Sequence, residues 1–227
     1  MGEPKRGAHA AHRGPADPAG QRASRQRNRH GEGTRLRAEI VSAAERLMAA
    51  GSAEDSLSLR AVAREAGIAA PSIYLHFASK EELQRGIVDE FFVDLRDTIV
   101  EAFAETPDPP QALLSGCLAY CRFAEQRPGA YRALFATPRD GATAGPGEPD
   151  SGRDALGTLV DALARCMEAG CAPSTDPFAL AVEVWTALHG IASLRWAMPG
   201  FGWPPLEEQV RRVLESVAGV RFDGDAD

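Results

Sequence analysis

Residues 57–83 constrain the fold more than any other part of the chain, because they contain start and stop signals for consecutive helices. Ser58 stands where a side-chain oxygen can cap a helix that opens at Leu59. An apolar stripe at helical spacing follows, and then Gly67, which can adopt the left-handed conformation that ends a helix. Pro71 fits the first turn of a second short helix, where its missing N–H costs nothing.

A longer helix is predicted to follow directly. Ser79 and Glu82 stand in the relation of a capping box, and Leu83 begins the buried face of a helix from Lys80 to about Glu105. Two short helices joined by a tight glycine turn form a helix-turn-helix, whose second helix enters the major groove of DNA. The segment therefore predicts a DNA-binding head.

Residues 34–83 resemble the DNA-binding domain of the TetR family of bacterial transcriptional regulators. The most specific part is Ser-Ile-Tyr-x-His-Phe-x-Ser-Lys-x-x-Leu at residues 72–83, which places polar, aromatic and basic residues at fixed offsets from one capping box. The resemblance implies phosphate contacts from Ser58, Tyr74, His76 and Lys80, and approach to base edges by Arg60, Ala70, Pro71 and Ser72. The alternative interpretation is that the aromatic residues belong to the core and that the histidine is an ordinary surface residue.

One departure from the family pattern affects sequence recognition. Ala69 and Ala70 occupy positions that are often polar in the family. Alanine can contact a thymine methyl group but reads no hydrogen-bond pattern. Direct readout is therefore expected from Arg60 and Ser72, and further specificity from the shape of the DNA.

The distribution of charge supports a nucleic-acid partner although the whole chain is acidic, with a net charge of −7. Residues 1–85 contain 14 Lys and Arg against 10 Asp and Glu, and residues 86–227 contain 11 against 22. The basic part thus coincides with the helix-turn-helix, and the acidic part would discourage the rest of the protein from lying on DNA.

Residues 1–33 are predicted to be a disordered basic arm, because they hold no hydrophobic residue larger than Met1. Four spaced arginines between residues 22 and 29 lead to Arg35 at the start of the first helix. Such an arm either reaches the minor groove or phosphates, as homeodomain arms do, or is a solvated tail. Residues 223–227 are predicted to be a disordered acidic tail.

The fold class predicted for the chain is all-α, with about nine helices and no alternating β pattern. A helix from Thr34 to Gly51 completes a three-helix head, residues 34–83. Residues 84–222 form a ligand-binding and dimerisation bundle, interrupted by a mobile loop at 137–152 that is rich in glycine and proline. The predicted helices of this body after the connecting helix cover residues 108–126, 128–135, 154–170, 176–197 and 206–217.

Candidate ligand-binding residues lie in two of these helices. Trp185 and His189 share a helix face in a string that resembles a Trp…His-Gly motif of one group of TetR bodies; the alternative is that both serve the core. Cys117, Tyr120, Cys121 and Phe123 on the helix at 108–126 would add a mixture of apolar and polar groups. The two cysteines, four residues apart, suggest a thiol sensor or, with His189, a soft-metal site, against the more usual buried cysteine. No cofactor and no metal ligand are assigned.

These features predict a cytoplasmic regulator, more specifically a repressor that a small-molecule effector releases from DNA. A single recognition helix covers few base pairs, so we expect a homodimer on a palindromic operator, paired through segments 154–170 and 176–196. No run of eighteen apolar residues and no signal-peptide core occurs, so no membrane partner is expected. A thiol-sensing regulator is the alternative. A helical enzyme is a remote one, because the chain has no catalytic motif such as Gly-x-Ser-x-Gly or a phosphate loop.

Overall fold

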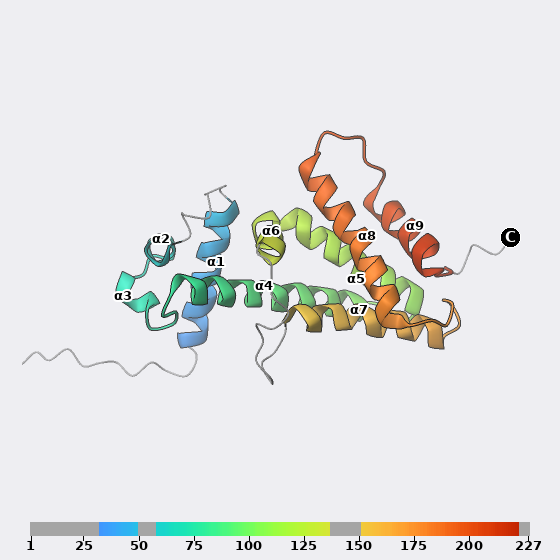
Figure 1. Cartoon of the computed structure of the whole chain (residues 1–227), viewed down its shortest axis with the longest axis horizontal. Helices are drawn as coiled ribbons and strands as arrows, with labels where there is room; N and C mark the ends of the chain where they lie inside the picture. Colours follow the sequence, from blue (N-terminus) through green and yellow to red (C-terminus); the bar gives the residue numbers. More distant parts are fainter. Residues whose placement is uncertain (1–31, 50–57, 137–150, 223–227) are drawn as a thin grey trace, which may run out of the picture.

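The computed structural model of the chain describes residues 32–49, 58–136 and 151–222, and these residues form nine helices and no strand (Figure 1). The helices are α1 (Glu32–Ala49), α2 (Leu59–Glu65), α3 (Ala70–Ile73), α4 (Lys80–Phe103), α5 (Pro109–Gln126), α6 (Pro128–Ala136), α7 (Ser151–Glu168), α8 (Pro177–Ala197) and α9 (Leu206–Ala218). The all-α prediction is therefore confirmed for the part of the chain that is described.

Local signals in the sequence set the helix boundaries of the head. The Ser58 hydroxyl accepts the N–H of Ala61 at 3.2 Å and caps α2. Gly67 has a φ of +69° and turns the chain between α2 and α3, which only glycine does without strain. Pro71 lies in the first turn of α3. These three predictions are confirmed.

The start of α4 is capped twice. The Ser79 hydroxyl accepts the N–H of Glu82 at 3.1 Å, as predicted. The Glu82 carboxylate reaches back to the N–H of Ala78 at 2.7 Å, one residue before the cap. Together these bonds satisfy two backbone donors at a helix end that has no intrahelical partners for them.

One aromatic ring fills the core of the head. Phe77 is 1% exposed and packs directly on α4, where a Cβ atom added to Gly86 would lie 2.7 Å from the Phe77 Cε1 atom. The Arg37 guanidinium lies over the same ring, 5.1 Å from its centre, and pairs with Glu90 of α4 at 2.7 Å. The ring therefore joins the helix-turn-helix to both α1 and α4.

The body surrounds the C-terminal part of α4. Figure 1 shows α4 running from the head into the body, where α5 and α7 lie along it and α8 covers both of them. Helix α9 packs on the outside against α5 and α8, and α6 contacts α1 as well as α4 and α5. By length and composition alone α8 would suffice to cross a membrane, yet it packs against three helices of the body.

Two predicted boundaries are wrong by two residues each. Helix α1 begins at Glu32, so residues 32 and 33 are helical and not part of a disordered arm. Helix α7 begins at Ser151, so residues 151 and 152 do not belong to the predicted loop at 137–152. Ser151 is buried and its hydroxyl donates to the Asp89 carboxylate of α4 at 3.2 Å, a tertiary contact that local composition does not reveal. The rest of the predicted arm, loop and acidic tail lies outside the described residues.

Replacement of Phe77 by alanine should make the head unfold at a much lower urea concentration than in the wild type. Loss of a fully buried ring leaves a cavity between α1, α3 and α4, and such substitutions cost about 3–5 kcal/mol of unfolding free energy. Leu75→Ala is the matched control, because Leu75 is 84% exposed and its loss should change stability by no more than about 0.5 kcal/mol. Urea denaturation followed by circular dichroism measures both, and equal effects would show that Phe77 does not hold the head together.

Candidate functional site

The predicted DNA-contacting residues other than Arg35 lie between the start of α2 and the start of α4. Helix α3 has only four residues, and Ile73, which is fully buried, fixes it against the core. Pro71 is exposed, and Ala70 and Ser72 are half-buried beside it. Arg60 is exposed at the second position of α2.

Tyr74 and His76 do not lie on the recognition helix. Tyr74 is the C-terminal cap of α3, and both residues belong to the turn that leads to α4. Tyr74 is 51% exposed, which contradicts the alternative that it is a core aromatic, whereas Phe77 is indeed core. The turn therefore presents a phenol and an imidazole next to Lys80, the first residue of α4, at the positive end of that helix.

The side chains of two more predicted residues have defined partners within the head. The Ser58 hydroxyl serves as the cap of α2, and as a hydroxyl it can still donate one hydrogen bond of its own. Arg35 pairs with Glu39 one turn on along α1 at 3.0 Å, and both side chains are well exposed. An exposed pair of this kind is weak enough to exchange for a phosphate.

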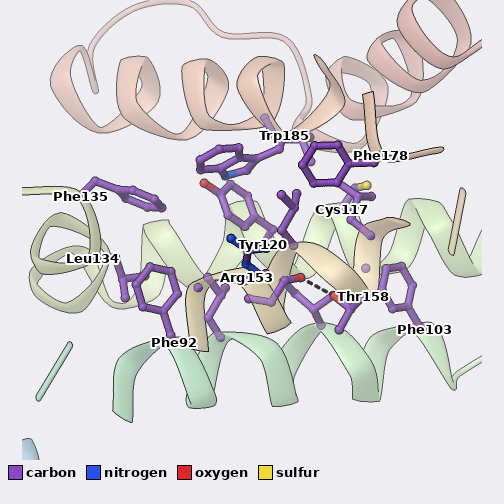
Figure 2. Close-up of a pocket in the computed structure, with 18 residues that line it drawn as sticks. Phe92, Phe103, Cys117, Tyr120, Leu134, Phe135, Arg153, Thr158, Phe178 and Trp185 are labelled. Atoms are coloured by element: carbon purple, nitrogen blue, oxygen red, sulfur yellow. Dashed lines mark hydrogen bonds between the residues drawn. The ribbon is translucent and has the colours of Figure 1, made fainter. Parts of the chain in front are cut away.

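A cavity of about 660 Å³ lies inside the body, within the size range of pockets for small molecules (Figure 2). Five helices enclose it. Its lining consists of Phe92, Leu95, Ile99 and Phe103 of α4; Gly116, Cys117 and Tyr120 of α5; Leu134 and Phe135 of α6; Gly152, Arg153, Ala155, Leu156, Thr158 and Leu159 of α7; and Phe178, Trp185 and Leu188 of α8. The walls are therefore mainly aromatic and aliphatic.

Half of the predicted ligand-binding residues line this cavity. Cys117, Tyr120 and Trp185 do so. Cys121 is buried beside them but is not part of the lining, and Phe123 packs under the Arg127 guanidinium, 5.0 Å from its ring centre. His189 likewise lies behind the wall.

His189 belongs to a hydrogen-bond chain that supports the wall from behind. Its Nδ1 atom lies 2.7 Å from the Tyr131 hydroxyl and 3.3 Å from that of Tyr120, and the two hydroxyl groups are 3.0 Å apart. With the His189 proton on Nε2, Nδ1 accepts from the nearer Tyr131 hydroxyl, and Tyr120 donates to the Tyr131 oxygen. Both hydroxyl groups and Nδ1 then have partners within the chain.

Burial keeps this network uncharged. It raises the pKa of Tyr120 far above its usual range, with a further increase from neighbouring Tyr131, and it raises the pKa of Tyr131 as well. Burial also lowers the pKa of His189 below its ordinary value of 6.5. At neutral pH the network therefore consists of two phenols and a neutral imidazole.

Burial disfavours the thiolate form of three of the four cysteines. Cys117 and Cys121 are buried, and burial raises the pKa of both thiols, that of Cys121 to about 12. Cys166 is also buried, with a pKa raised to about 12. A thiol is nucleophilic only as thiolate. Within residues 32–49, 58–136 and 151–222, no group of three His, Cys, Asp or Glu side chains is placed to hold a metal ion.

A clamp of charged residues, which no local sequence pattern predicts, joins the body to the head. Arg127, the residue between α5 and α6, donates two hydrogen bonds to the Glu45 carboxylate of α1, at 2.8 and 2.7 Å. A third bond reaches Asp94 of α4 at 2.8 Å. On the same side Arg132 of α6 donates to the Met48 carbonyl of α1 at 3.1 Å.

Comparison with known proteins places both parts of the chain in one group. Residues 40–86 match the family model described as bacterial regulatory proteins, tetR family, and residues 113–217 match that of the tetracyclin repressor-like C-terminal domain. Together these models cover well over half of the chain. The Trp…His-Gly resemblance of the body stays a prediction.

Solved structures share the fold across head and body. A TetR family transcription regulator from Marinobacter aquaeolei VT8 is 16% identical, with a TM-score of 0.66 over 83% of this chain and 98% of that one. A TetR-family transcriptional regulator from Haemophilus influenzae RD is 21% identical, with a TM-score of 0.64 over 83% and 99%. A protein of unknown function from Rhodococcus sp. RHA1 is 23% identical, with a TM-score of 0.66 over 85% and 96%.

The pKa of His189 predicts a specific dependence of stability on pH. Because the folded-state pKa lies below the unfolded value near 6.5, protons bind more readily to the unfolded chain, and the free energy of unfolding should fall as pH drops through 6.5. Urea titrations between about pH 7.5 and 5.5 measure this fall, which His189→Asn should diminish. Equal curves for the wild type and the His189 variant would contradict a neutral, partly buried imidazole.

Proposed function

This chain belongs to the TetR family of bacterial transcriptional regulators, DNA-binding proteins that are not enzymes, and from that premise we propose that it is a repressor released from its operator by a small molecule. The observation on which the proposal rests is the position of α6. One side of this helix contacts α1 of the head, and Leu134 and Phe135 on it line the cavity of the body. A ligand that moves α6 would therefore act on the head directly.

The head has the geometry needed for a DNA contact. We propose that Tyr74, His76 and Lys80 bind phosphates from the end of α3 and the start of α4, with a further contact from Ser58. Arg60, Ala70, Pro71 and Ser72 would face base edges, and Arg35 would extend the contact along α1. The exposure of Tyr74 and Arg60 supports this assignment. Operator DNA lies in the cytoplasm, so we expect the protein there.

We propose that two copies pair through α7 and α8, which pack side by side in one chain. Only 33% of an 18-residue apolar stretch of α8 is buried within one chain, and Leu194 and Trp196 near its end are each 50% exposed. A helix that is apolar all round is normally covered on every side. An isologous contact with a second α7–α8 pair would cover the outer face and set two heads on a palindromic operator.

The Arg127 clamp supplies the proposed route from effector to operator. It ties the start of α6 to Glu45 of α1 and Asp94 of α4 through three hydrogen bonds. A shift of α6 would change the angle at which α1 and α4 hold the helix-turn-helix, and so the spacing of two heads in a dimer. By linkage, operator DNA would weaken effector binding by the same factor by which effector weakens operator binding.

Thiol sensing through Cys117 and Cys121 is a poorer explanation of this structure. Both thiols are buried, and burial disfavours the thiolate that would react with an oxidant or an electrophile. A Cys117→Ser, Cys121→Ser variant should therefore respond to effector as the wild type does. We treat these residues as small apolar groups in the wall of the cavity and behind it.

Selection from random duplex DNA should enrich a palindrome, and Tyr74→Ala or Lys80→Ala should weaken binding to it about tenfold or more, since each variant loses phosphate contacts in both subunits. Lys80→Ala should also make the slope of log affinity against log salt concentration shallower by about one per subunit, because one phosphate contact is lost in each. Arg212→Ala removes the same charge from α9, far from the head, and should bind normally (Figure 1). Enrichment of a single half-site would contradict the dimer, and an unchanged affinity in both head variants would contradict the proposed contacts.

Arg127→Met should loosen α1 from the body while leaving the cavity intact, because Arg127 does not line it. Hydrogen exchange measured by mass spectrometry should become faster in the α1 segment around Glu45. Arg195→Met is the matched control: Arg195 also pairs with a carboxylate, that of Glu125 at 3.1 Å, but its hydrogen bonds go to Glu125, Pro204 and Gln209 and not to α1. Equal protection of α1 in both variants would show that the clamp does not connect body and head.

A further inference from the structure

We propose that the cavity accepts an uncharged molecule with an extended apolar part, of the alkyl-chain type, and that Phe103 is the end stop that limits its length. The inference rests on the proposed function, since it names the chemical class of the effector. Three features of the cavity support it: its shape, the absence of a usable charge among its described lining residues, and the contact between Phe103 and Gly116.

The cavity extends along α4. Phe92, Leu95, Ile99 and Phe103 form one wall at helical spacing, and the first and last of them are eleven residues apart, about 16 Å along the helix axis. Figure 2 shows Phe92, Leu134 and Phe135 at one end and Phe103 at the other. A molecule that contacts both ends must therefore be elongated.

The lining suits neither a cationic nor an anionic ligand. It contains no Asp or Glu among the residues that are described, so a bound cation would lose its hydration without a carboxylate partner. Its one charged residue, Arg153, is exposed and already interacts within the chain. A bound anion would therefore have to compete with these interactions for the Arg153 guanidinium.

The polar atoms of the wall are also committed to the protein. Thr158 donates to the Ala155 carbonyl at 2.7 Å, and Tyr120 is part of the hydrogen-bond chain that ends at His189. No buried side-chain nitrogen or oxygen lacks a hydrogen-bond partner in the described part of the chain. Binding must then come mainly from the apolar surface that ligand and wall remove from water.

Phe103 closes the far end because α5 has no side chain opposite it. A Cβ atom added to Gly116 would lie 2.2 Å from the Phe103 Cε1 atom and 2.6 Å from Cδ1, so the ring rests directly on the backbone of α5. The Arg165 guanidinium lies 6.0 Å from the ring centre. A methyl group at residue 116 must displace this ring, and removal of the ring must lengthen the cavity.

The test uses straight-chain primary alcohols of increasing length, with alkyltrimethylammonium ions and carboxylates of equal length, added to the purified full chain without DNA. Trp185 lines the cavity, so its fluorescence reports binding, and calorimetry gives the dissociation constants. We expect each alcohol of suitable length to bind about tenfold or more tightly than either charged counterpart. Phe103→Ala should move the preferred length to longer alcohols, and Gly116→Ala should move it to shorter ones.

Two further variants control for misfolding and for the nonspecific loss of a buried ring. Phe103→Leu keeps an apolar side chain at the site in case the alanine variant is poorly folded, and it should shift the preference in the same direction by less. Phe123→Leu removes a buried ring of α5 that does not line the cavity, and it should leave the preferred length unchanged.

The outcomes separate this inference from the proposed function. Failure of every alcohol to bind, or an unchanged length preference in Phe103→Ala and Phe103→Leu, would overturn the inference even if operator binding is normal. Tighter binding of the carboxylate, abolished by Arg153→Gln, would also overturn it and identify an anionic ligand. Alcohol binding that does not release the selected operator would support the inference and count against ligand release as the function.

Discussion

The guanidinium of Arg127 connects the two halves of the molecule, and its planar shape explains why one residue can do so. Two of its N–H groups pair with both oxygens of Glu45, and a third reaches Asp94, while its face lies over the rings of Phe91 and Phe123. The hydrogen bonds to Glu45, more than the one to Asp94, raise the already high pKa of this group, so it is always charged. A lysine ammonium has no such planar fork and could not pair with both oxygens of Glu45 while also reaching Asp94 in this geometry.

Through this clamp, the segment that leads into the cavity wall is hydrogen-bonded to the head. Helix α6 starts one residue after Arg127, and its next two turns supply Tyr131 to the hydrogen-bond chain and Leu134 and Phe135 to the cavity. The wall of the cavity is thus apolar inside and hydrogen-bonded behind. Such an arrangement keeps the wall in one conformation when the cavity is empty, since each polar group behind it would lose a partner on moving.

Helix starts could be predicted from the sequence because they depend on neighbours within four residues. Ser58 and Ser79 each cap the helix that they were expected to cap. The lining of the cavity depends on which face of each helix meets another, and no local pattern contains that information. Cys117 and Tyr120 on α5 line the cavity, whereas Phe123 on the same helix turns toward the Arg127 clamp.

The same limit applies to residues that were missed. Phe103 and Phe92 have the spacing of ordinary core positions on α4, and only the packing of α5 and α7 against that helix leaves a cavity beside them. Arg127 follows a helix end in the sequence and looks like any solvated arginine, because both of its partners lie more than thirty residues away. His189 was expected in the cavity with Trp185, but the Tyr131 hydroxyl from α6 holds it behind the wall.

The position of α8, between the cavity and the proposed dimer contact, limits how the cavity can open. Phe178 near its start lines the cavity and is still 57% exposed, and Trp185 two turns later lines it as well. If a second copy covers the outer face of α8, as we propose, one face of this helix binds the ligand and the opposite face binds the partner. A ligand that displaced α8 outward would then strain the dimer contact, whereas displacement of α6 is opposed only by contacts within one chain. Entry of a ligand is therefore expected to move α6, and with it the Arg127 clamp, in preference to α8.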